Sequence, residues 1–71
     1  MKVEYTIHVR DRIIERKISE TWIHETIAFP DIKSRRGNKF YVRKKINGVT
    51  LEVVYVKENY IKIITEYIVR R

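Results

Sequence analysis

Cysteine is absent from this chain of 71 residues, and proline and glycine are scarce, with one and two residues respectively. The absence of cysteine excludes a disulfide framework and any thiolate metal site. No apolar run approaches the roughly 18 residues of a membrane-spanning helix, and the first residues lack the apolar region of a signal peptide. We therefore expect a cytoplasmic protein without a membrane partner.

Acidic residues are also in short supply. Nine Asp and Glu stand against 16 Lys and Arg, which leaves a formal charge of +7. Such an excess favours polyanionic partners, so we expect nucleic acid first and an acidic protein second. Residues 1–71 should form a single domain with a small core, because so short a chain buries only about 60% of its unfolded surface. The absence of glutamine and the twelve isoleucines are typical of proteins from hot environments.

Two helices are predicted in the N-terminal half. Residues 2–6 alternate polar and apolar and suit a short edge strand, after which Thr6 is a good N-cap. Helical spacing over residues 7–18 predicts two apolar stripes, one with Ile7, Ile14 and Ile18 and the other with Val9 and Ile13. A helix with two such stripes should be wedged between two surfaces. Ser19 should cap a second helix, which carries core residues Trp22 and Ile27 and ends near Phe29, because Pro30 disfavours helical geometry in the residue before it.

A β-hairpin is the clearest element of the C-terminal half. Asn47-Gly48 is the strongest short-range signal for a two-residue type I′ turn, and it separates two runs of strand-forming residues within 39–56. If Ile46 pairs with Val49, Arg43 lies opposite Glu52 on one face. The other face is then the core face, and it carries Phe40, Val42, Lys44, Ile46, Val49, Leu51, Val53 and Tyr55. Lys44 is the discordant member of this set, and its amine should extend past the sheet edge.

The remaining segments complete the predicted fold. Residues 30–38 are polar and basic without a period and are expected to form an exposed loop. Residues 60–69 should form a third strand, apolar on both faces and central in the sheet, that pairs antiparallel with its neighbour. The sequence therefore predicts an α+β fold, with two helices packed on one face of a three-stranded antiparallel sheet, or of a four-stranded one if residues 2–6 join it.

One candidate site lies on the first predicted helix. His8, Arg12 and Arg16 recur every fourth residue and therefore share one helical face, where the two guanidinium groups could bind a phosphate. His8 is suited to general acid or base catalysis, because imidazole titrates near neutral pH. The alternative is a solvated face in which Arg12 pairs with Glu15 and His8 with Asp11. We expect no metal, since His8 and His24 lack a third ligand with recognisable spacing.

A second candidate site is a basic, aromatic-edged surface that could hold an RNA backbone electrostatically, with tyrosine available to stack on a base. Its residues are Lys33, Arg35, Arg36, Lys39, Tyr41, Arg43 and Lys45. The alternative is a solvent-facing β surface kept soluble by its charges. Tyr67, near the end of the third strand, is either a core aromatic or a proton donor at the sheet edge.

Several of these features occur together in one known pattern. The order His8-x3-Arg12-Ile13-x2-Arg16-x-Ile18-Ser19, a short helix, Pro30-Asp31, a Gly-Asn-Lys-Phe-Tyr strand entry and an Asn-Gly hairpin resembles a small family of prokaryotic domains of unknown function. That family looks distantly similar to the RelE, ParE and BrnT group of ribonuclease toxins, in which two helices pack on an antiparallel sheet. The resemblance extends over nearly the whole chain.

What the resemblance implies is a ribonuclease of the toxin type that needs no cofactor. His8, Arg12 and Arg16 match the motif and would be catalytic, and Tyr67 is a looser match. A base would act on the RNA 2′-hydroxyl while arginines stabilise the charged phosphorane, which leaves a cyclic phosphate end. The alternative is a non-catalytic module that binds nucleic acid or an acidic, antitoxin-like protein. A homo-oligomer is a further expectation, because the two apolar faces of strand 60–69 exceed what two short helices can cover.

Overall fold

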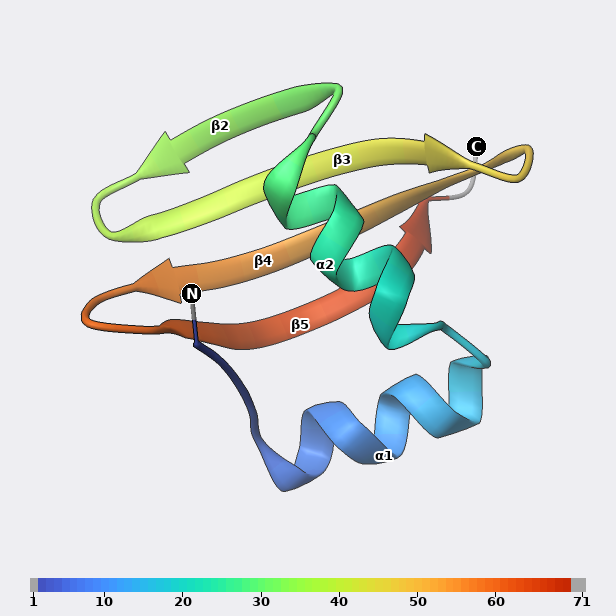
Figure 1. Ribbon diagram of the computed structural model, residues 1–71, viewed down its shortest axis with the longest axis horizontal. Coiled ribbons are helices and arrows are strands. Elements are labelled where there is room, and N and C mark those ends of the chain that lie inside the picture. The colour runs from blue at the N-terminus through green and yellow to red at the C-terminus, as the bar shows by residue number, and fades with distance from the viewer. Residues whose placement is uncertain (1, 70–71) are drawn as a thin grey trace.

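The computed structural model describes residues 2–69, which form two helices and a five-stranded sheet (Figure 1). In chain order the elements are β1 (Val3–Tyr5), α1 (Ile7–Arg16), α2 (Glu20–Ala28), β2 (Ile32–Arg36), β3 (Lys39–Ile46), β4 (Val49–Lys57) and β5 (Ile61–Val69). No helix within residues 2–69 has the length and apolar character needed to cross a bilayer.

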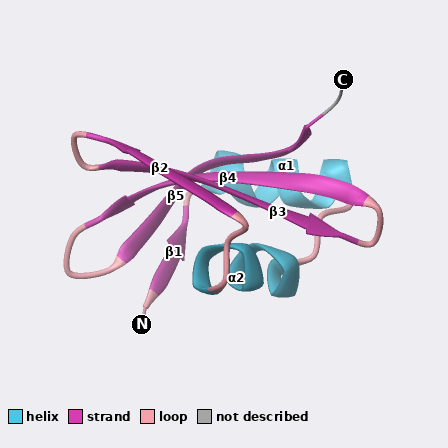
Figure 2. Cartoon of the chain, turned by 90° about the horizontal axis from the view of Figure 1, so that it is seen from above, coloured by secondary structure: helices cyan, strands magenta, loops and turns pink. Residues whose placement is uncertain are grey.

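The sheet is mixed, with strand order β1-β5-β4-β3-β2. Neighbouring strands run antiparallel except β1, which pairs parallel with the first part of β5, with Val3 opposite Ile61. The prediction of a three-stranded antiparallel sheet is therefore wrong, although the fold remains α+β. Helix α2 lies across β3 and β4, and α1 lies beside β5 (Figures 1 and 2).

Strand β2 was not predicted from the sequence. Residues 30–38 do not form a loop, because Ile32–Arg36 pairs along its whole length with β3. Gly37 and Asn38 make the two-residue connection, and Gly37 adopts a φ of 61°. Such a φ at the first turn position is what glycine supplies in a type II′ hairpin. All five side chains of β2 are exposed, so no apolar alternation marks the strand.

The β3–β4 hairpin has the register that the sequence predicted. Ile46 pairs with Val49 and Arg43 with Glu52. Asn47 and Gly48 both have positive φ, 51° and 82°, as a type I′ turn requires. The predicted face is the one that lies under the helices, where Val42, Leu51 and Val53 are fully buried.

Part-way along strand β5, the alternation of its side chains between the two faces of the sheet shifts by one residue. The strand lies between β4 and β1, which confirms the prediction of a central strand, and its register against β4 shifts between Val54 and Tyr55. Ile63 pairs with Tyr55 and Thr65 with Val54, which leaves Ile64 as the extra residue of a β-bulge. The bulge explains why both faces of this segment look apolar in the sequence.

The helix boundaries follow from their caps. Thr6 Oγ1 accepts a hydrogen bond from the Val9 N–H at 3.2 Å, so its predicted role as N-cap is confirmed. Helix α1 ends at Arg16, two residues earlier than predicted, because Lys17 adopts a left-handed φ of 56°. Ser19 caps α2 as predicted, its Oγ accepting from the Thr21 N–H at 3.1 Å. Both caps satisfy backbone donors that the helix itself leaves free.

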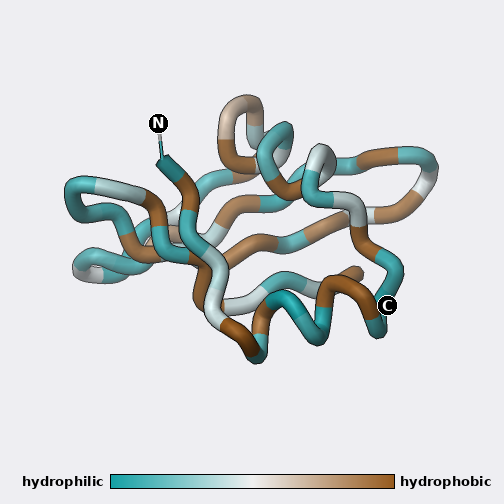
Figure 3. The backbone as a smooth tube through the Cα atoms, turned by 60° about the horizontal axis from the view of Figure 1, so that its bottom comes forward, coloured by the Kyte–Doolittle hydropathy of each residue, from teal (hydrophilic) through white to brown (hydrophobic). Residues whose placement is uncertain are grey.

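The core lies between the helices and the sheet. Val9, Ile13 and Ile18 pack into it, and Trp22 and Ile27 pack against it as predicted. Of the predicted stripe of Ile7, Ile14 and Ile18, only Ile18 is buried, whereas Ile7 is 78% exposed and Ile14 is 76% exposed, so α1 is not wedged between two surfaces. Along the strands, apolar stretches alternate with polar ones (Figure 3), as expected for a sheet with one face buried.

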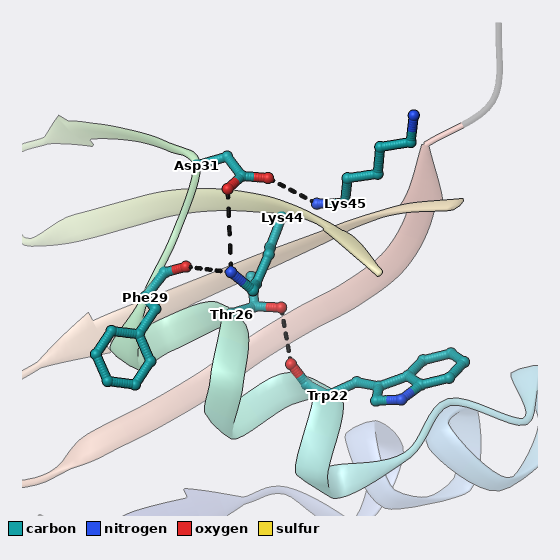
Figure 4. A network of polar contacts seen from close by, with 6 residues as sticks. All are labelled: Trp22, Thr26, Phe29, Asp31, Lys44 and Lys45. Carbon is teal, nitrogen blue, oxygen red and sulfur yellow. Dashed lines mark hydrogen bonds and ion pairs between the residues drawn. The ribbon is translucent and has the colours of Figure 1, made fainter. Parts of the chain in front are cut away.

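Lys44 ties the end of α2 to β3. Its Nζ donates to the Phe29 carbonyl at 2.9 Å, at the C-terminal end of α2 (Figure 4). Asp31 lies beside it, with Oδ1 4.0 Å from the same Nζ and Oδ2 accepting from the Lys45 backbone N–H at 2.9 Å. A cation at the C-terminus of a helix also opposes the negative end of the helix dipole. The discordant lysine thus fixes α2 on the sheet.

Candidate nucleic-acid interface

The face of the sheet opposite the helices, hereafter the open face, is basic and aromatic. Strand alternation assigns it the side chains that oppose the buried set of Val42, Leu51 and Val53. They include Ile32, Ser34 and Arg36 from β2, Lys39, Tyr41, Arg43 and Lys45 from β3, Glu52 and Val54 from β4 and Lys62 and Tyr67 from β5, and Glu4 of β1 shares the face opposite Lys62. Six of them line a shallow pocket of about 430 Å³: Ile32, Ser34, Arg36, Tyr41, Arg43 and Glu52.

A buried carboxylate organises the centre of the open face. Glu52 is 6% exposed, and its Oε1 accepts from Arg43 Nε at 2.6 Å while its Oε2 accepts from the Tyr67 hydroxyl. A charge-assisted pair of this kind is stronger than a neutral hydrogen bond and fixes the orientation of the donors. Arg43 and Tyr67 are therefore held in place on the open face, and the predicted pairing of Arg43 with Glu52 is confirmed.

The seven residues predicted to bind nucleic acid are divided between two faces. Arg36, Lys39, Tyr41, Arg43 and Lys45 share the open face. Lys33 and Arg35 project from the helix side of β2, where both cations lie over the Phe40 ring, at 5.1 and 5.2 Å from its centroid. The division arises because β2 is a strand, and adjacent residues of a strand point to opposite faces.

Arg16 of α1 lies beside Tyr67 of β5. Arg16 donates to the backbone carbonyl of Glu66, and it lines a pocket of about 450 Å³ with Glu15, Tyr67 and Ile68. Tyr67 thus adjoins Arg16 on one side and Glu52 on the other, which connects α1 to the open face. Arg12 also lies near Glu66, since its charge affects that carboxyl.

His8 is further away. It lies eight residues before Arg16 on the same helix, which corresponds to about 12 Å along the axis. The helix therefore spreads His8, Arg12 and Arg16 over two turns, with Arg12 one turn from each. Within residues 2–69, neither of the ion pairs considered as alternatives, Arg12 with Glu15 or His8 with Asp11, is formed.

One buried acid was not predicted from the sequence. Glu66 is fully buried on the helix side of β5, and neither of its carboxyl oxygens has a hydrogen-bond partner among residues 2–69. Burial raises the pKa of this carboxyl, and the nearby charges of Arg16 and Arg12 oppose the rise. A signal was available: Glu66 lies between Ile64 and Ile68 at alternate positions of the predicted strand, so it shares a face with two apolar side chains.

A second unpartnered polar group lies close to the first. The Tyr5 hydroxyl is buried without a hydrogen-bond partner. Burial raises the pKa of Tyr5, the charges of Glu20 and Glu66 raise it further, and Arg10, whose guanidinium lies 5.5 Å from the ring centroid, lowers it. Tyr5 on β1 and Glu66 on β5 are therefore two neighbouring buried polar groups between the sheet and the helices.

Metal ligands do not gather in this fold. Across residues 2–69 there is no group of three or more His, Cys, Asp or Glu side chains placed to hold a metal ion. His24 instead lies near Tyr5, with 6.4 Å between the ring centroids.

Comparison with known proteins identifies the family. No curated protein and no solved structure matches the chain. One family model, described as a domain of unknown function (DUF4258), matches residues 5–68, which include both helices and reach from the last residue of β1 to the penultimate residue of β5. The predicted membership of a family of unknown function is confirmed, and the chain belongs to the DUF4258 family.

Proposed function

We propose that this protein binds RNA through the open face of its sheet. The observation that carries the proposal is the row of Lys39, Tyr41, Arg43 and Lys45 along β3, with Arg36 beside it on β2, on the face of the sheet opposite the buried Val42, Leu51 and Val53. Alternate residues of a strand lie about 6.8 Å apart, so β3 presents an aromatic ring within a line of cations. Phosphates would contact the cations while a base stacks on Tyr41.

Charge supports the same proposal. The segment 32–46 carries seven Lys and Arg and no acidic residue. Arg43 is the one cation of this row that is paired with an acid on the open face, and the pairing also fixes its position. Counterion release by the remaining cations would supply most of the affinity, and the shallow pocket beside Tyr41 would accept a splayed base.

The test is the salt dependence of RNA binding. The affinity for a single-stranded RNA oligonucleotide, measured by fluorescence anisotropy, should fall steeply with ionic strength. Lys45→Gln should reduce the slope by about 1 without changing sequence preference. Lys33→Gln, on the other side of the sheet, is the matched control. If the two variants change the salt slope equally, the open face is not the binding site for RNA. A shallow slope together with a fixed stoichiometry for a protein partner would indicate the rival function, in which the protein binds an acidic, antitoxin-like protein.

We further propose, as a second function, metal-independent RNA cleavage of the type found in the RelE, ParE and BrnT toxins. The observation that favours it is the shared pocket of Arg16 and Tyr67 at the end of the RNA-binding face, with Arg12 one turn away. Arg12 and Arg16 would stabilise the phosphorane, and His8 would transfer a proton beside Arg12. The 2′-oxygen attacks phosphorus and loses its proton to the base. The bond to the 5′-oxygen then breaks as that oxygen gains a proton, which leaves a 2′,3′-cyclic phosphate and a 5′-hydroxyl.

Cleavage in the presence of a chelator tests this second function. Wild-type protein should convert RNA to products with cyclic phosphate ends. Arg12→Ala should lower the rate by about 100-fold or more, as loss of a preorganised charge does elsewhere. Arg10→Ala, two residues away on the same helix, is the control and should retain the rate. If wild-type protein binds RNA and leaves it intact, the cleavage proposal is wrong and the binding proposal stands.

A further inference from the structure

The two edges of the sheet are protected to different degrees. On one side the edge strand is β1, which is only three residues long and pairs with residues 61–63 of β5, and beyond it Arg16 of α1 occupies the Glu66 carbonyl. On the other side β2 has no strand beyond it among residues 2–69, and all five of its residues are exposed. Unpaired backbone N–H and C=O groups along an edge strand are a template for another strand. Strand β2 is therefore the available edge.

The charge of this edge determines what can pair with it. Lys33 and Arg35 flank the strand on the helix side, and Arg36 flanks it on the open face. The nearest acid, Asp31, is already bonded to the Lys45 N–H and lies beside the Lys44 amine. A second copy of β2 would place lysine and arginine opposite one another, and like charges directly opposite are destabilising. The edge thus repels its own copy and favours an acidic strand.

We propose that the β2 edge binds an extended acidic peptide segment of a partner protein, which adds to the sheet as a sixth strand. Acidic side chains at alternate positions would meet Lys33 and Arg35 on the helix side. On the open face, an acidic side chain would meet Arg36, and an apolar one would cover Ile32, which is 61% exposed. Main-chain hydrogen bonds supply affinity in this mode of recognition, and the alternating side chains supply specificity.

This site differs from the RNA-binding face. Lys33 and Arg35 lie on the opposite side of the sheet from Lys45 and Tyr41, so the two can be altered separately. The cation–π contacts of Lys33 and Arg35 with Phe40 keep their charged groups near the strand rather than extended into solvent.

The probe is a capped ten-residue peptide in which Glu alternates with Val and Thr. Titration followed by NMR should shift the β2 amide signals and slow hydrogen exchange of amides along β2. Two controls have matched charge: the same peptide with two central residues replaced by proline, which cannot donate to the edge, and a scrambled peptide without alternation. Both should bind at least about tenfold more weakly.

Variants locate the contact. Lys33→Gln/Arg35→Gln should raise the Kd for the peptide by about tenfold, as expected when two charge pairs are lost, and leave RNA affinity unchanged. Lys45→Gln should lower the RNA affinity and leave the Kd for the peptide unchanged. Equal binding of the proline peptide, or shifts confined to the open face, would overturn the proposal, because binding would then be electrostatic without strand addition. A dimer of the free protein that is paired through β2 would overturn it as well.

Discussion

Glu66 is the residue whose environment has the clearest consequence for stability. Its carboxyl is fully buried without a hydrogen-bond partner, and burial raises its pKa above the usual 4.5. A raised pKa means that the folded state holds the proton more tightly than the unfolded chain. The free energy of unfolding therefore receives its full contribution from this group below pH 4.5, and that contribution is lost as the pH rises through the raised pKa.

Glu66→Gln tests this reasoning, because an amide has nearly the same shape and does not ionise. The variant should match the wild type near pH 4 and exceed its free energy of unfolding at pH 8 by about 1–3 kcal/mol, because ionising the buried wild-type carboxyl costs free energy and the amide does not ionise. Urea unfolding at both pH values measures the difference. Glu58→Gln, at an exposed turn position, is the control. Parallel pH profiles for wild type and Glu66→Gln would show that Glu66 does not cause the pH dependence.

At the scale of the elements, the joint between α2 and β3 depends on one amine. Lys44→Met keeps the apolar stem of the side chain but removes the Nζ that donates to the Phe29 carbonyl. We expect a loss of about 1 kcal/mol in the free energy of unfolding, because a charged donor and its interaction with the helix dipole disappear together. Lys45→Met is the matched control, since the Lys45 contact uses its backbone N–H. Equal losses in the two variants, measured by urea unfolding, would contradict the assigned role.

Local chemistry explains which elements the sequence could predict. Asn47-Gly48 strongly favours a type I′ turn. The register of the hairpin and the pairing of Arg43 with Glu52 then follow from counting residues outward from that turn. Strand β2 could not be recognised by alternation, because an edge strand with both faces exposed has no buried side to mark. The Gly37-Asn38 pair was its one signal. The bulge at Ile64 was equally hidden, since an extra residue in a run of isoleucine and threonine leaves no trace in composition.

The candidate site, too, could be predicted only in part from the sequence. Sequence alone identified the basic residues that β2 and β3 contribute to the open face, because charge is visible without structure, but it did not identify Lys62 of β5. It could not assign Lys33 and Arg35 to the other face, since that assignment depends on β2 being a strand. It also placed Tyr67 at the sheet edge as one of two alternatives, but the contact with Glu52 depends on the bulge that turns Tyr67 to the open face.

At the scale of the whole molecule, the excess of seven positive charges and the basic β2 edge bear on self-association. Pairing of strand 60–69 between subunits, which the sequence led us to expect, is disfavoured because β5 lies inside the sheet, between β1 and β4. The free edge, β2, carries Lys33, Arg35 and Arg36, which repel a second copy. We therefore expect a monomer of 8.7 kDa in light scattering at both low and moderate salt.

Removing the repulsion should change this state. Lys33→Thr/Arg35→Thr/Arg36→Thr leaves an edge strand that is uncharged and rich in β-branched residues, so it should associate with a mass that rises with concentration. Lys39→Thr/Lys45→Thr lowers the net charge by two without altering the edge, and it should remain monomeric. A wild-type dimer whose mass is unaffected by the triple substitution would place the contact elsewhere, with the exposed Ile7 and Ile14 of α1 as the next surface to substitute. A monomeric triple variant would show that charge is not what keeps the β2 edge unpaired.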